Sequence, residues 1–127
     1  GVVLMIIGLP IPDRRLGGNT RAHHMVLHKL RKEHKLLAAA ATRQAMRLLE
    51  GQDRNYSGYR LEFFYAVKRR RDVDNLVFAT KAYLDGVSAA LGQDDSAWDL
   101  LGARIRVDKD VHPRMEIQMK RKHEHTV

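Results

Sequence analysis

The sequence contains no cysteine, only 3 prolines and 6% aromatic residues, and it has no long apolar run. Without cysteine, the protein can form neither a disulfide framework nor a zinc site with thiolate ligands. No apolar stretch approaches the ~20 residues that a helix needs to cross a bilayer, so we expect no membrane anchor. The absence of disulfides favours a location inside the cell, in the cytoplasm.

Acidic residues are also scarce relative to basic ones. The 127 residues include 23 lysines and arginines but only 15 aspartates and glutamates, which gives a formal net charge of +8. Such a charge favours binding to nucleic acid or to an anionic membrane surface. The hydrophobic fraction of 44% argues against disorder, and the chain length predicts a single domain, residues 1–127, around one core.

Hydrophobic periodicity predicts two helices and four strands. The first helix combines apolar residues at helical spacing with many lysines and arginines, and it stops before Gly51. The second begins at Asp72 or Asp74, ends before Gly92, and is apolar on too many sides for a surface helix. The apolar character of the second helix would be explained either by contact with a second subunit or by burial on two sides in the core. The expected helices cover residues 23–49 and 74–91, and the expected strands cover residues 2–9, 60–68, 103–108 and 114–120.

The resulting element order is β-α-β-α-β-β. We therefore expect an α+β fold in which a mixed sheet is packed by two helices. The connection between the last two strands, residues 109–113, is short. We expect these two strands to form a hairpin.

An acidic motif directly follows three arginines. Residues 69–76 read Arg-Arg-Arg-Asp-Val-Asp-Asn-Leu. In an extended segment, Asp72 and Asp74 point to the same side and can share a hard divalent cation such as Mg²⁺. A third carboxylate would come from the Asp94-Asp95 pair. The competing interpretation is that the first pair caps the second helix and that the later pair forms a polar turn.

Lys81 follows Asp74 by seven residues, which places the two side chains on nearly the same helix face. A lysine there could stabilise the negative charge of a phosphate in a transition state. It could equally form an ion pair with Asp85, four residues later. Spacing alone does not choose between the two roles.

Together these residues resemble the RusA family of Holliday junction resolvases, which are small dimeric endonucleases often carried by phages and prophages. The resemblance covers residues 7–119. In the family, the lysine usually follows the asparagine by three residues, whereas Lys81 follows Asn75 by six. The matching segments are residues 69–76, Lys81 with Asp85, Asp94-Asp95, Leu9-Pro10-Ile11-Pro12, the loop from Asn19 to His23 and the basic helix after it.

The resemblance implies an enzyme that needs Mg²⁺, or alternatively Mn²⁺, and resolves four-way DNA junctions in recombination and repair. It implies a homodimer that hydrolyses two phosphodiester bonds, matching the two-fold symmetry of the junction, in a bacterial or phage-infected cell. It also assigns roles. Asp72, Asp74 and Asp95 would be catalytic metal ligands, Asp94 a further candidate ligand, and Lys81 the catalytic lysine.

Basic and polar residues around the motif and on the first helix are candidates for binding DNA phosphates. Each of these side chains could instead be a solvated surface group. The candidates are Arg69, Arg70, Arg71, Asn19, Arg21, Lys29, Arg31, Lys32 and Lys35.

Three other functions are compatible with the same residues. The first is a nucleic-acid-binding protein without catalysis, in which the aspartates only cap a helix. The second is a nuclease that cuts a broader range of branched DNA, such as forks and flaps. The third is a basic structural protein of a larger assembly. Dependence of DNA cleavage on a divalent cation and on branch structure would separate these functions.

Overall fold

The computed structural model describes residues 3–18, 21–49 and 55–121 and has the α+β architecture expected from the sequence. Its sheet packs against two helices, and the order of elements is the predicted one. Two single-turn 3-10 helices, η1 and η2, precede α1 and β3. The elements are β1 (Val3–Leu9), η1 (Arg14–Leu16), α1 (His24–Arg47), β2 (Gly58–Tyr65), α2 (Val73–Leu91), η2 (Asp95–Ala97), β3 (Asp99–Val107) and β4 (Arg114–Lys120).

The strands follow the order β1-β4-β2-β3 across the sheet. β4 is antiparallel to both β1 and β2, whereas β3 is parallel to β2. The expected hairpin between the last two strands is therefore wrong, because β2 lies between them. The parallel pair β2–β3 is joined through α2, as a crossover connection requires.

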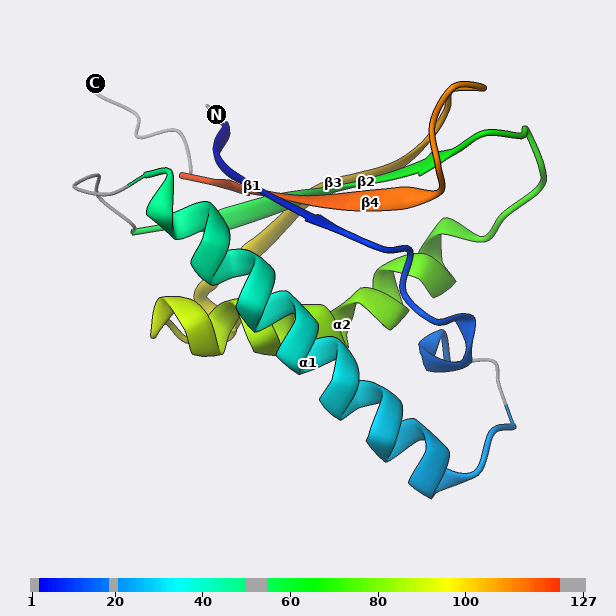
Figure 1. The fold of residues 1–127 in the computed structure, drawn as a ribbon, viewed down its shortest axis with the longest axis horizontal. Coiled ribbons are helices and arrows are strands. Elements are labelled where there is room, and N and C mark those ends of the chain that lie inside the picture. Colours follow the sequence, from blue (N-terminus) through cyan, green and yellow to red (C-terminus); the bar gives the residue numbers. More distant parts are fainter. Residues whose placement is uncertain (1–2, 19–20, 50–54, 122–127) are drawn as a thin grey trace.

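Both helices lie on one face of the sheet (Figure 1). Side chains alternate between the two faces of each strand, and those that point toward the helices form the core. β4 lies in the interior of the sheet, and its Met115, Ile117 and Met119 are fully buried. The core residues contributed by β1 and β2 are Met5, Ile7, Leu9, Leu61 and Phe63.

α2 packs against both the sheet and α1. Tyr83 and Val87 belong to the core beneath the sheet, while Ala82 packs with Leu30 of α1. Gly86 lies where the two helices cross. A Cβ there would clash with the backbone carbonyl of Lys35. Burial on two sides within one chain therefore accounts for the apolar character of α2.

The ends of α2 lie at opposite ends of the sheet. α2 starts after the end of β2, and the chain then enters β3, which is parallel to β2. The first residues of α2 are thus near the ends of β2 and β3, and its last residues are near their starts. No helix within the described ranges is long and apolar enough to cross a membrane.

Candidate functional site

Asp72 is the N-cap of α2. Its Oδ1 accepts hydrogen bonds from the backbone N–H groups of Asp74 (2.9 Å) and Asn75 (3.3 Å). These donors are among those that an α-helix leaves without a partner at its N-terminus, where the helix dipole also favours a negative charge. The capping interpretation is therefore confirmed for Asp72. Oδ2 accepts no hydrogen bond from the described residues, so half of the carboxylate is available to a ligand.

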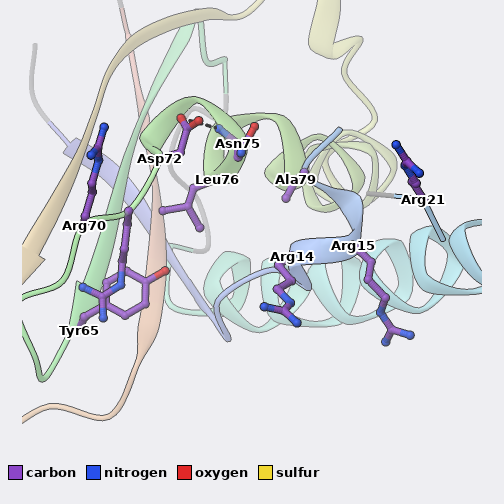
Figure 2. A pocket seen from close by; sticks show the side chains of 11 residues that line it. Arg14, Arg15, Arg21, Tyr65, Arg70, Asp72, Asn75, Leu76 and Ala79 are labelled. Atoms are coloured by element: carbon purple, nitrogen blue, oxygen red, sulfur yellow. Dashed lines mark hydrogen bonds between the residues drawn. The ribbon is translucent and has the colours of Figure 1, made fainter. Parts of the chain in front are cut away.

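A cavity of about 820 Å³ opens beside this carboxylate. Figure 2 shows Asp72 and Asn75 at the start of α2, with Arg70 and Tyr65 on one side and Arg14 and Arg15 on the η1 segment below them. Three separate stretches of the chain thus supply its wall. The lining residues are Arg14, Arg15, Gly17, Arg21, Tyr65, Arg70, Arg71, Asp72, Asn75, Leu76 and Ala79. We call this the arginine cavity.

Two of the five arginines in the arginine cavity are held in place by identifiable contacts. The Arg71 guanidinium stacks on the Tyr65 ring, 3.6 Å from its centroid, and donates a hydrogen bond to the backbone carbonyl of Val67. Arg15 forms a 2.8 Å ion pair with Asp13. The hydrogen bond from Arg15 is the main reason that the pKa of Asp13 falls to about 2.

The other three arginines, Arg14, Arg21 and Arg70, form no ion pair with a described carboxylate. The wall of the arginine cavity thus contains five arginines, one of them paired with Asp13, and a single carboxylate, Asp72. A concave surface with this excess of one charge concentrates counter-ions of the opposite sign. The cavity can therefore attract a polyanion such as a nucleic-acid backbone.

Asp74 lies in the first turn of α2 and is exposed, but it does not line the arginine cavity. It belongs instead to the solvent-facing stripe of α2. Phe78, Lys81 and Asp85 follow it along the same stripe, at steps of four, three and four residues. Phe78 is 48% exposed, and the Lys81 ammonium lies 4.6 Å from the centroid of its ring. The alternative ion pair between Lys81 and Asp85 is not formed.

The later acidic pair lies at the other end of α2. Asp94 accepts a hydrogen bond from the backbone N–H of Ser96, which lowers the pKa of its carboxyl group. Asp95 lies against Asp85. Its pKa is raised, first by burial and then by the negative charges of Asp85 and Asp94.

The expected convergence of Asp95 with Asp72 and Asp74 does not occur within one chain. Asp85, the neighbour of Asp95, is thirteen residues beyond Asp72, which corresponds to roughly 20 Å along a helix. Across the described residues, no three side chains of histidine, aspartate or glutamate gather as a metal site. The expectation is wrong for the isolated chain because α2 is a single uninterrupted helix that separates the two acidic segments.

The basic residues predicted to bind DNA fall on two surfaces. Arg70, Arg71 and Arg21 line the arginine cavity, and Arg69 is exposed beside it in the chain. The four candidates on α1 are all exposed, and one of them, Lys29, lies 3.9 Å from Glu33. Asn19 lies outside the described residues. The α1 candidates are Lys29, Arg31, Lys32 and Lys35.

The sequence interpretation missed Arg14, Arg15 and Tyr65. The adjacent arginines after the proline segment are visible in the sequence, but their place in the wall of the arginine cavity is not. They reach the arginine cavity because the loop after β1 packs on α2, with Gly17 close to the backbone of Asn75. Only this tertiary contact identifies them as candidate binding residues.

Comparison with known proteins gave no match, either to a protein-family model or to a curated protein sequence.

Proposed function

We propose that this protein is a divalent-cation-dependent endonuclease of the RusA type, which cuts branched DNA, including four-way junctions, inside a bacterial or phage-infected cell. The observation that carries the proposal is the arginine cavity, with a half-available carboxylate of Asp72 at its edge. The arginines would bind phosphates of the DNA backbone and hold the strand against the acidic residues.

Mg²⁺, or Mn²⁺ in its place, fits the chemistry of the acidic residues, because carboxylate oxygens are the ligands that these hard cations prefer. When bound, such a cation supplies polarisation of the phosphodiester and a water of lowered pKa. Asp72 would contribute Oδ2, since Oδ1 caps the helix, and Asp74 would contribute its exposed carboxylate. Asp72 and Asp74 supply two carboxylates, whereas the resemblance implies a third, from Asp95.

A homodimer would supply the missing carboxylate. The stripe of α2 has spacings of four, three and four residues, and this spacing is the same in both directions along the helix. Its residues are Asp74, Phe78, Lys81 and Asp85. A second α2 lying antiparallel along this stripe would place Asp74 opposite the partner's Asp85, and Phe78 opposite the partner's Lys81. The partner's Asp95 contacts the partner's Asp85 and would join Asp74 there. The dimer would also cover the exposed Phe78 ring.

Cleavage of a labelled four-way junction with Mg²⁺ tests the enzymatic proposal. We expect Asp72→Asn, Asp74→Asn and Asp95→Asn each to abolish cutting while DNA binding persists. We expect Lys81→Ala to reduce cutting strongly. Asp110→Asn removes an exposed aspartate outside the site and should cut like the wild type. If Asp74→Asn retains full cutting, the assigned site is wrong.

Mixing two inactive variants tests whether the site is shared between chains. In the proposed dimer, a heterodimer of Asp74→Asn and Asp95→Asn chains keeps one complete site, so nicking of the junction should return. If each site belonged to a single chain, both sites of that heterodimer would be defective. Persistent inactivity of the mixture, with heterodimers present, would therefore exclude the shared site.

The second candidate is a nucleic-acid-binding protein without catalysis. It is favoured by the two hydrogen bonds of Asp72, which already give that residue a structural role. This candidate predicts DNA binding by the wild type but no cleavage with Mg²⁺ or Mn²⁺. Comparing a four-way junction with matched duplex, fork and flap substrates would also show whether a cleaving enzyme is specific for junctions.

A further inference from the structure

The face of the sheet that points away from the helices carries a group of charged side chains around one aromatic ring. Because Leu61 and Phe63 point into the core, their neighbours Glu62 and Phe64 point to this open face. Figure 1 shows both helices on the other side. In the strand register, Phe64 lies between Arg114 of β4 and Arg106 of β3.

The open face carries two glutamates, and both are paired with arginines: Glu116 forms a 2.7 Å ion pair with Arg114. Glu62 is only 4% exposed and forms ion pairs with Arg104 (2.7 Å) and Arg106 (3.5 Å). Burial tends to raise the pKa of Glu62, but the two arginines lower it overall, so the carboxylate stays charged. The side chains of Arg104 and Arg106 remain 57% and 52% exposed. The surface that reaches solvent is therefore the positively charged one.

Phe64 combines these cations with a stacking surface. The guanidinium groups of Arg114 and Arg106 lie 4.1 and 5.7 Å from the centroid of its ring. A cavity of about 430 Å³ opens next to the ring, and its wall also includes Arg106, Lys109 and one carboxylate, Asp108. An aromatic ring, guanidinium groups and a neighbouring hollow are the chemistry that holds an unpaired base together with its phosphates. Bases inside a duplex do not present their faces in this way.

We propose that the open face of the sheet at Phe64 binds an unpaired, single-stranded segment of DNA, at a surface separate from the arginine cavity. Phe64 and Tyr65 are consecutive residues on opposite faces of β2, and Tyr65 lines the arginine cavity. The two surfaces therefore meet at the end of the same strand. Two branches of one DNA substrate could bind there, one at the arginine cavity and the other at the open face. The inference rests on the proposed function only for the choice of DNA as the ligand.

Fluorescence anisotropy with a labelled oligothymidylate in EDTA tests the proposal on the full chain. Losing the stacking surface in Phe64→Leu should weaken binding roughly 5- to 160-fold, because base stacking on an aromatic ring contributes about that factor. Phe64→Tyr keeps the ring and should bind like the wild type. Arg114→Gln should weaken binding and reduce the slope of log K against log salt by about 0.7, the value for one phosphate that is no longer neutralised. Arg43→Gln removes an exposed arginine on α1 and should change nothing.

Unchanged oligothymidylate binding by Phe64→Leu or by Arg114→Gln would overturn the proposal. Thermal unfolding followed by circular dichroism would identify a Phe64→Leu chain that fails to fold, in which case Phe64→Tyr and Arg114→Gln decide. Binding of the wild type to anionic vesicles but not to oligothymidylate would also overturn it. The two proposals can also fail separately. If the wild type never cleaves DNA but Phe64→Leu binds single strands more weakly than the wild type, the proposed enzyme is contradicted and this second surface is supported.

Discussion

Asp72 has two tasks open to it, and each uses a different oxygen of the same carboxylate. Oδ1 accepts the hydrogen bonds that begin α2, and Oδ2 is available at the edge of the arginine cavity. An asparagine can perform the first task nearly as well, because its side-chain oxygen also accepts N-cap hydrogen bonds. It cannot perform the second, because a neutral amide is a poor ligand for a hard cation in place of a carboxylate.

The two tasks of Asp72 can be separated by measuring stability and cleavage on the same variants. We expect Asp72→Ala to lower the free energy of unfolding by about 1 kcal/mol, the usual cost of losing an N-cap. Asp72→Asn should stay within a few tenths of a kcal/mol of the wild type in urea denaturation, yet lose cleavage. If Asp72→Asn and Asp72→Ala were equally destabilised, capping by Oδ1 would not be the structural role of this residue.

At the scale of the elements, α2 determines where every candidate acidic residue lies. Its length separates the two acidic segments, and its N-terminus forms the edge of the arginine cavity. Its position depends on a close crossing with α1 at Gly86, where the backbones of Lys35 and Ala39 leave no room for a side chain. A shift of this crossing would move Asp72 relative to the arginines of η1.

Gly86→Ala therefore tests the crossing. The new methyl group would meet the backbone of α1, so the helices must move apart, at an expected cost of about 1–3 kcal/mol in urea denaturation. Gly8→Ala is a matched control, because a Cβ there has nothing within 4 Å and its backbone is not in the left-handed region. It should be neutral or slightly stabilising. Full stability of Gly86→Ala would mean that the backbones of α1 and α2 are not in close contact at this position.

At the scale of the whole molecule, candidate polyanion-binding charge is spread over three surfaces: the arginine cavity, the segment of α1 from Lys29 to Lys35, and the open face of the sheet. The net charge of +8 therefore predicts polyanion binding but does not say which surface provides it. Salt dependence can distinguish these surfaces, because the slope of log K against log salt depends on how many phosphates the protein neutralises.

We expect the double variant Arg14→Gln/Arg70→Gln to bind junction DNA more weakly in EDTA and to reduce that slope by about 0.9 for each phosphate that is no longer neutralised. The double variant Arg43→Gln/Arg47→Gln removes the same charge from positions near the end of α1 and serves as the control. Equal slopes for the two double variants would mean that the arginine cavity does not bind DNA specifically and that only net charge matters.

Much of the local structure could be predicted from the sequence. The second helix was expected over residues 74–91 and is observed as Val73–Leu91, with Gly92 in the left-handed conformation at its end. The alternation of residues 114–120 likewise predicted β4. These features follow from hydrophobic periodicity and capping, which act between residues close in the chain.

The sequence by itself thus determined the elements, their order, the positive charge and the acidic motif at the entry to α2. Only the tertiary structure decided that β2 separates β3 from β4, that η1 brings Arg14 and Arg15 into the cavity at the start of α2, and that α2 holds Asp95 away from Asp72. The reason is physical. Strand neighbours and shared cavities depend on contacts between residues far apart in the chain, and no local pattern of residue types specifies which of those contacts forms.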